Sequence, residues 1–227
     1  GAYRPADVAW QMKVASEAEV DYITFDGAGG GTGMSPVPMM NEMGVPTVYL
    51  EALVLKAANM LKAKGRYVPD ISIAGGFINE TQIVKAMALS NFGDGPMVKT
   101  VTTGRSPLTA VMKSEYFLKL AKDGKLPKSF AEVYGDRPEK FFALADEFKA
   151  KFGEKVGNEI PWSAVGLYSY VQRMSTGMKQ LLAGMRKFRI ELVSREDLAA
   201  LTPLASEVTG IPMMHKVDED IFENILL

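Results

Sequence analysis

A glycine-rich stretch, DGAGGGTGMSP at residues 26–36, directly follows the apolar run VDYITF. Glycine lets a ligand approach the backbone closely, but ordering several glycines costs conformational entropy that a bound ligand can offset. Asp26 and Thr32 add polar side chains to the stretch. It lacks the GK[ST] ending of a P-loop and only loosely approaches a dinucleotide fingerprint, which argues against nucleoside triphosphate or NAD binding. We therefore predict a ligand-binding loop, and the alternative is a mobile loop without a ligand.

Two further glycine positions end apolar runs. Gly75 and Gly76 close YVPDISIAGG at 67–76, and Gly104 with Arg105 closes MVKTVTTGR at 97–105. Loops after the carboxyl ends of parallel strands bind ligands, glycine N–H groups can point at an anion, and arginine adds a charge-assisted hydrogen bond. The four residues predict a phosphate site. Ordinary strand-to-helix turns are the alternative.

Strands and helices that would position these loops alternate along the first half of the chain. Strands are predicted at 20–27, 67–76 and 97–105, and helices at 5–18, 47–65 and 79–93, the last capped by Asn79. This alternation predicts an α/β fold with a parallel sheet. Three strands are too few for a closed barrel of about 250 residues, so we expect the last three strands of a (β/α)8 TIM barrel.

Beyond Arg105 the pattern changes to amphipathic helices. They are expected at 108–120, 137–153, 161–189 and 194–210, with Ser194 as a helix cap and Thr202-Pro203 starting a further short helix. A linker is expected at residues 122–138. We divide the chain into a partial barrel with the binding loops at 1–121 and a helical C-terminal extension at 122–227, and we expect that its beginning, GAYRPADVAW, is cut from a longer protein.

Composition narrows the function further. The net charge of -1 and pI near 6.0 argue against nucleic acid and an anionic membrane as partners, and no run approaches the roughly 18 apolar residues that a membrane span needs. We expect a cytoplasmic protein. Without cysteine the chain has no disulfide, thiolate nucleophile or iron–sulfur ligand, and its one histidine, His215, is expected at the surface rather than in a metal site. Redox chemistry would need an organic cofactor.

The segments VDYITFDGAGGGTGMSP, GVPTVYLEALVLKAANMLKAKGRYVPDISIAGGFINETQIVKAMAL and KTVTTGR occur in this order and spacing. They resemble the FMN-binding domain of the glutamate synthase large subunit, and more closely its shorter, stand-alone relatives. GAYRPADVAWQMKVASEAEVDYI and GLYSYVQRMSTGMKQLLAGMRKFR also resemble those relatives, so the resemblance covers most of the chain. The DGxGGGTG loop is its most specific part.

The resemblance implies a (β/α)8 barrel with FMN at the carboxyl ends of the strands, and a flavin oxidoreductase acting on CH-NH2 donors in glutamate biosynthesis. Its reaction would be reductive amination of 2-oxoglutarate through 2-iminoglutarate. Residues implied to hold the FMN phosphate are Gly75, Gly76, Gly104 and Arg105. Residues implied to line the substrate side are Asp26, Gly29, Gly30, Gly31 and Thr32. The resemblance identifies no catalytic residue here.

The chain departs from glutamate synthase in two ways. The family carries a cysteine cluster with a three-iron centre after the eighth strand, whereas GRSPLTAVMKSEYF has no cysteine, so no iron–sulfur cluster is expected within this chain. The amidotransferase domain and the first barrel strands are also absent. We expect the missing barrel half, amidotransferase and electron-donor subunits as partners, and a homo-oligomer.

Two other functions stay open. The chain could be a non-catalytic partial barrel that binds a phosphate-bearing ligand, or that pairs with another chain through its open strand edges. A lyase or isomerase barrel without flavin is disfavoured, because no pair of Lys, Glu or His falls at the strand ends to perform acid–base chemistry. Stoichiometric flavin in the purified protein would separate the oxidoreductase from both.

Overall fold

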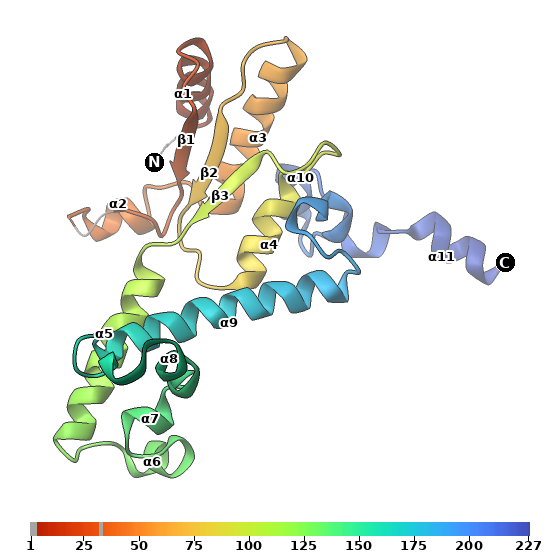
Figure 1. Ribbon diagram of the computed structural model, residues 1–227. Helices are drawn as coiled ribbons and strands as arrows, with labels where there is room; N and C mark the ends of the chain where they lie inside the picture. Colours follow the sequence, from red (N-terminus) through yellow and green to blue (C-terminus); the bar gives the residue numbers. More distant parts are fainter. Residues whose placement is uncertain (1–3, 32–33) are drawn as a thin grey trace. The chain divides into compact units, whose positions relative to one another are not determined.

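The computed structural model describes residues 4–31 and 34–227 (Figure 1). The chain forms two compact units, one of Gly1–Thr103 with Lys179–Leu227 and the other of Gly104–Met178. The C-terminal residues therefore pack with the N-terminal part of the chain. The sequence analysis placed a domain boundary between residues 121 and 122, and that boundary stays a prediction.

A three-stranded parallel sheet lies at the centre of the first unit. It consists of β1 (Tyr22–Asp26), β2 (Asp70–Ala74) and β3 (Val98–Thr102), in that order (Figure 1). The register aligns Phe25 with Ile73, and Ile73 with Val101. The predicted α/β class and its three parallel strands are confirmed.

Three helices pack with this sheet: α1 (Pro5–Glu17), α3 (Thr47–Ala63) and α4 (Glu80–Leu89). The helix α3 contacts both α1 and α4. Strands that neighbour each other in chain order, joined by right-handed crossovers, place the connecting helices on the same face. A segment of a (β/α) barrel has the same arrangement, with all connecting helices on one face of the sheet. That this sheet is part of such a barrel stays a prediction.

The core of the first unit lies between the sheet and these helices. Alternate strand residues point into it, because side chains in a strand alternate between the two faces. The helical stripe predicted for residues 47–65 is buried at Leu50, Val54 and Ala58. Asn79 caps α4 as predicted, since its side chain accepts a hydrogen bond from the Gln82 backbone N–H. The fully buried side chains include Val8, Met12, Phe25, Leu50, Val54, Ile71, Ile73 and Val98.

The C-terminal part of the first unit is held by buried polar contacts. The Asn91 amide donates hydrogen bonds to the carbonyl oxygens of Val193, at 2.7 Å, and Glu191, at 3.3 Å. Arg195 donates to the Leu89 carbonyl oxygen at 2.9 Å. The helix expected over 194–210 is two short helices, η3 (Arg195–Asp197) and α10 (Pro203–Thr209). The intervening residues 198–202 are not helical.

Both expected helix starts are confirmed in this part of the chain. Ser194 forms a capping box with Asp197, and the Thr202 hydroxyl accepts from the Ala205 backbone N–H at 3.2 Å. The remaining elements are η2 (Ile190–Leu192), η4 (Met214–Lys216) and α11 (Glu219–Leu226). A short helix, α2 (Val37–Asn41), follows the glycine-rich stretch and was not predicted.

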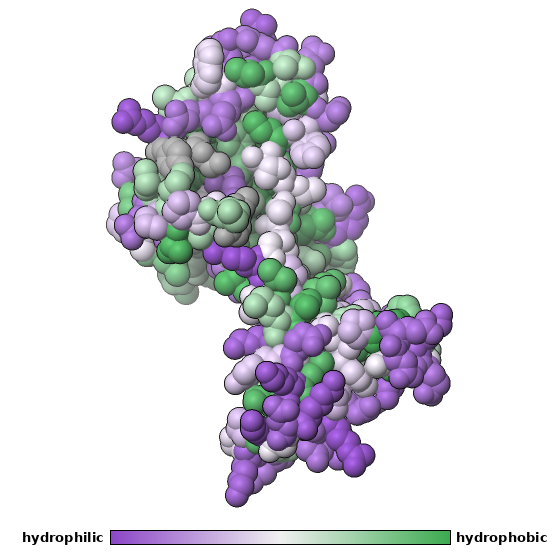
Figure 2. Space-filling model, turned by 90° about the vertical axis from the view of Figure 1, so that its left-hand side faces the viewer, coloured by the Kyte–Doolittle hydropathy of each residue, from purple (hydrophilic) through white to green (hydrophobic). Residues whose placement is uncertain are grey.

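The second unit is helical. Its elements are α5 (Arg105–Lys122), α6 (Lys128–Tyr134), α7 (Pro138–Phe141), α8 (Ala145–Phe152), η1 (Gly153–Lys155) and the first part of α9 (Trp162–Gly184). Its small core is formed by Ala145, Phe148, Val156 and Val165. The face of this unit that Figure 2 shows is mostly hydrophilic.

One helix expected in the second unit is broken. The pattern over 137–153 predicted a single helix, but Phe142 is extended between α7 and α8. Its ring stacks on Trp162 with 6.0 Å between centroids. The break in the predicted helix thus coincides with an aromatic contact between residues 20 positions apart. Among the helices of residues 4–31 and 34–227, none combines the length and apolarity that crossing a membrane requires.

Candidate functional site

The carboxyl ends of β1 and β2 meet in a group of three residues, Gly27, Thr47 and Gly75, which we call the packed cluster. The Gly27 backbone N–H donates to the Ala74 carbonyl oxygen at 2.9 Å, and the Thr47 hydroxyl donates to the Gly75 carbonyl oxygen at 2.7 Å. A side chain on Gly75 would lie only 2.8 Å from the Gly27 nitrogen. The two loops therefore need glycine to come this close. Thr47 was not singled out from the sequence.

A small cavity lies beside the packed cluster, in the glycine-rich stretch. Its volume is about 120 Å³, and its lining includes Asp26, Gly30 and Gly31. A methyl group on Gly30 would occupy the space of the Asp26 carboxylate. Glycine at position 30 thus allows the carboxylate to lie over the loop. Three residues of the predicted substrate side are brought together here.

Gly29, a fourth residue of that predicted set, is not part of the lining of this cavity. Gly29 has a φ of +84° and donates its N–H to the Met40 carbonyl oxygen at 2.8 Å. A side chain on it would approach the Gly76 Cα to 3.6 Å, so Gly29 lies between the two loops. Thr32 lies outside the described residues.

The small cavity has room for one functional group rather than a whole substrate. Asp26 gives it a carboxylate, which attracts a hydrogen-bond donor or a cation and repels another carboxylate. The cavity is therefore suited to a hydrogen-bond donor or a positively charged group.

Gly75 and Gly76 differ in the free space beside their Cα atoms. The space beside Gly75 is filled by the packed cluster, whereas a side chain on Gly76 would meet nothing nearer than the Ala28 carbonyl oxygen at 3.9 Å. Gly76 also has a φ of +75°, which favours glycine. Of the two, Gly76 fits the close approach of a phosphate, and Gly75 is explained by backbone packing.

The start of α4 is partly occupied by its own caps. The Gln82 side-chain oxygen accepts from the backbone N–H of Ile78 at 2.7 Å and Asn79 at 3.4 Å. Asn79 in turn accepts from the Gln82 N–H at 3.1 Å. These donors are satisfied within the protein, so the N-terminus of α4 offers an anion fewer N–H groups than an uncapped helix would.

Gly104 and Arg105 are the first residues of the second unit. Gly104 has a φ of -112°, and a side chain on it would meet no atom within 4 Å. Neither backbone conformation nor crowding therefore requires glycine there. Arg105 is exposed at the start of α5, and its predicted phosphate contact stays a prediction.

Residues 4–31 and 34–227 hold no group of three or more His, Cys, Asp or Glu side chains suited to a metal ion. His215 is exposed in η4, at the surface as expected.

Sequence reasoning missed Glu51, the most unusual ionisable residue of the first unit. It is 3% exposed, and its Oε1 atom has no hydrogen-bond partner among the described residues. Burial raises the pKa of its carboxyl to about 8. A signal was present, because Glu51, Leu55 and Ala58 share the spacing of one helix face.

Residues 5–108 match the family described as the conserved region in glutamate synthase. The chain is also similar to the archaeal-type glutamate synthase [NADPH] of Thermotoga maritima, with 37% identity over 76 residues, and to that of Thermotoga neapolitana, with 37% identity over 73 residues. These matches confirm the resemblance to glutamate synthase.

The similar region is a limited part of each protein. For the Thermotoga maritima enzyme it covers 33% of this chain and 14% of the relative. For the Thermotoga neapolitana enzyme the shares are 32% and 14%. No solved structure matches the chain.

Proposed function

We propose, from the premise that residues 5–108 match the conserved region in glutamate synthase, that this chain is part of an FMN-dependent oxidoreductase of that type. The reaction is the reductive amination of 2-oxoglutarate through its imine. The observation that carries this proposal is the cavity lined by Asp26, Gly30 and Gly31, at the strand ends beside the Gly75-Gly76 loop. Ligands bind at this end of parallel strands.

Each residue has a distinct part in this proposal. Asp26 orients the nitrogen end of the substrate by accepting a hydrogen bond, and the glycines of its loop let the substrate come close to the backbone. The resemblance assigns the FMN phosphate to Gly76 and, separately, to Gly104 with Arg105 at the start of α5. When bound, FMN supplies the hydride that reduces an imine carbon.

Partners follow from the chemistry that this chain lacks. It contains no cysteine, so it cannot bind an iron–sulfur relay through thiolates, and electrons must come from a separate donor. Ammonia must likewise come from solution or from an amidotransferase subunit. A partner that completes the barrel, a homo-oligomeric state and a cytoplasmic location remain predictions from the sequence.

An FMN titration followed by flavin fluorescence tests the proposal directly. We expect the chain to bind FMN, and Gly76→Ala and Arg105→Ala each to weaken binding about tenfold. The methyl group of Gly76→Ala blocks the close approach of the phosphate, and Arg105→Ala removes a charge-assisted hydrogen bond. The matched control is Gly65→Ala. Gly65 has a φ of +64°, close to the +75° of Gly76, but it lies at the end of α3.

The control separates backbone strain from phosphate binding, because both glycine variants force alanine into a similar conformation. The absence of FMN binding by the unmodified chain would contradict the proposal. Equal weakening by Gly65→Ala and Gly76→Ala would contradict the assignment of the phosphate to Gly76.

The open edges of the sheet favour a second candidate function, the binding of another chain. Within the described residues, β1 and β3 each pair with β2 alone. Thr24 and Thr100, one on each of these outer strands, are exposed. Exposed edges of parallel strands are normally covered. A stable complex with a strand-forming partner in the absence of FMN binding would favour this function over the oxidoreductase.

A further inference from the structure

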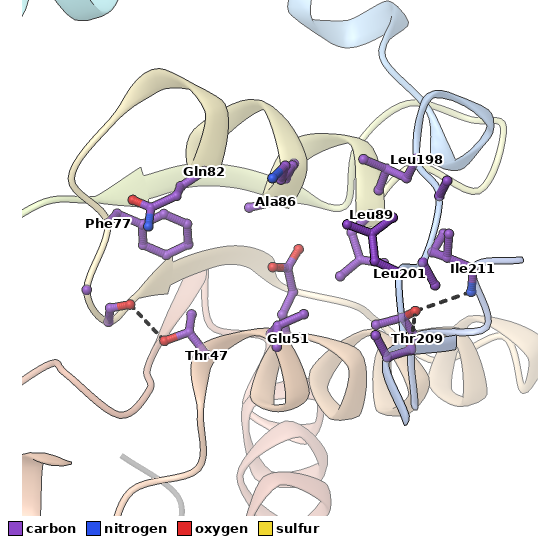
Figure 3. Close-up of a pocket in the computed structure, with 17 residues that line it drawn as sticks. Thr47, Glu51, Phe77, Gln82, Ala86, Leu89, Leu198, Leu201, Thr209 and Ile211 are labelled. Carbon is purple, nitrogen blue, oxygen red and sulfur yellow. Dashed lines mark hydrogen bonds between the residues drawn. The ribbon is translucent and has the colours of Figure 1, made fainter. Parts of the chain in front are cut away.

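A second and larger cavity lies in the first unit, between α3, α4 and residues 198–211 (Figure 3). All 17 of its lining residues belong to that unit, and its volume is about 420 Å³. Cavities that hold small organic molecules have volumes of roughly 300–1,000 Å³. Most of the wall is apolar, and its large side chains include Val48, Phe77, Leu89, Leu198 and Ile211. The cavity is therefore suited to a ligand with a hydrocarbon body.

One carboxyl group interrupts this apolar wall. Figure 3 shows the Glu51 side chain rising from α3 into the space below α4. Glu51 is almost completely buried, with 3% of its surface exposed. Its Oε1 atom has no hydrogen-bond partner within residues 4–31 and 34–227. A buried polar atom without a partner costs free energy, and a ligand with a hydrogen-bond donor removes that cost.

Other polar side chains of the cavity already have partners. The Thr47 hydroxyl donates to Gly75, and the Gln82 side-chain oxygen accepts from Ile78 and Asn79. The Thr209 hydroxyl donates to the Ala205 carbonyl oxygen at 2.6 Å. Glu51 is thus the polar group of the wall that most clearly lacks a complement.

The missing complement is a positive charge. Burial is the cause that raises the pKa of Glu51, and no cation of the described chain offsets it. Lys85 of α4 is the other ionisable side chain in the lining, and it is exposed. The lining residues from 198 to 211 include no ionisable side chain. A cation placed against Glu51 would therefore have to come from the ligand.

We propose that this cavity binds a small hydrophobic primary amine, whose nitrogen pairs with the Glu51 carboxylate and whose hydrocarbon body packs against the apolar wall. This site goes beyond the proposed glutamate synthase reaction. The substrates of that reaction carry two carboxylates. Burying them against an apolar wall would remove their hydration and provide no hydrogen bonds or positive charges in its place.

Amine binding also moves a proton. Near neutral pH the free Glu51 carboxyl holds its proton and the free amine is an ammonium ion. Pairing the ammonium with a carboxylate requires Glu51 to release that proton to solvent. Affinity should therefore rise with pH up to about 8, whereas binding of a neutral molecule of the same size should not depend on pH in this range.

The test uses three probes with the same six-carbon chain: hexylamine, hexan-1-ol and hexanoate. We expect calorimetry on the full chain to show that hexylamine binds at least tenfold more tightly than either other probe. Hexylamine binding should release about one proton at pH 6, as measured in two buffers of different ionisation enthalpy. Glu51→Gln should lose this preference and the proton release, and still bind hexan-1-ol as the unmodified chain does.

Glu17→Gln serves as the matched control, because Glu17 is an exposed residue of α1 paired with Lys13. It should leave hexylamine binding unchanged. Urea denaturation at pH 6 checks that both variants are folded. Equal affinity for hexylamine and hexan-1-ol, no binding of any probe, or unchanged hexylamine binding by Glu51→Gln would each overturn the proposal. Gly76, which is assigned above to the FMN phosphate, also lines this cavity, so the amine measurements are made without FMN. Their outcome then tests the amine site alone, and the FMN titration tests the flavin proposal.

Discussion

Gly75 and Gly104 each follow a parallel strand by one or two residues, yet their surroundings differ. Gly75 has a φ of +120° and lies against Thr47 and Gly27, whereas Gly104 has a φ of -112° and open space where a side chain would be. Glycine is therefore required by close backbone packing at Gly75, whereas a larger residue would fit at Gly104. Function should be sought where no neighbouring atom crowds the glycine, as at Gly76 and Gly104.

The largest effect is expected from Gly75→Ala. Alanine there would be strained at a φ of +120° and would collide with the Gly27 nitrogen, 2.8 Å away. We expect the free energy of unfolding to fall by about 3 kcal/mol or more, measured by urea denaturation. Gly65→Ala, which is strained but uncrowded, should cost only about 1 kcal/mol. Equal losses in the two variants would show that crowding at Gly75 is unimportant.

Beside the packed cluster, Glu51 should make stability depend on pH. Its pKa is about 8 in the folded protein and near the ordinary value of 4.5 in the unfolded chain. Between these values the folded state keeps a proton that the unfolded state releases, so stability falls as pH rises and levels off above 8. The loss approaches about 1.4 kcal/mol per pH unit at most.

Comparison with Glu51→Gln isolates this effect. Glutamine resembles the protonated acid and does not titrate, so the difference in unfolding free energy between the two proteins should change steadily across this pH range. Chemical denaturation at several pH values measures it. A constant difference from pH 5 to pH 8 would mean that Glu51 is not protonated in the folded protein.

A smaller effect is expected within the packed cluster from Thr47→Val. Valine keeps the shape of threonine but removes the 2.7 Å hydrogen bond to the Gly75 carbonyl oxygen. The free energy of unfolding should fall by about 1 kcal/mol. Thr47→Ser, which retains the hydroxyl, should lose less than Thr47→Val in the same denaturation experiment, and the reverse order would contradict a role for the hydroxyl.

The smallest change in stability is expected from Gly104→Ala. Its backbone suits any residue and a methyl group would touch nothing, so stability should change by no more than about 0.5 kcal/mol. Thermal unfolding is sufficient to measure this. A loss comparable to that of Gly75→Ala would remove the distinction between the two loops.

The sequence predicted the elements whose patterns are local. The three strands follow from short runs of β-branched and aromatic residues ending in glycine, and the start of α4 follows from Asn79. The loop containing Asp26 was predicted to bind a ligand. Three of its predicted residues line a small cavity, and their role in binding stays a prediction.

The features that the sequence analysis missed depend on contacts between residues far apart in the sequence. Phe142 is extended between α7 and α8, and its ring stacks on Trp162, a contact that the helical pattern of residues 137–153 does not indicate. Thr47 matters because it bonds to a loop 28 residues away. Glu51 lines a cavity whose wall also includes Leu198 and Ile211, and no periodicity within α3 indicates that these two residues share a cavity with it.

The wall formed by residues 198–211 has a consequence for how the protein is made. The first unit consists of the beginning and the end of the chain, with the second unit between them in sequence. On the ribosome, the sheet and its helices emerge long before the residues that complete the larger cavity. Its apolar surface must therefore stay exposed in the nascent protein, to chaperones or to misfolding, until residues 198–211 have been made.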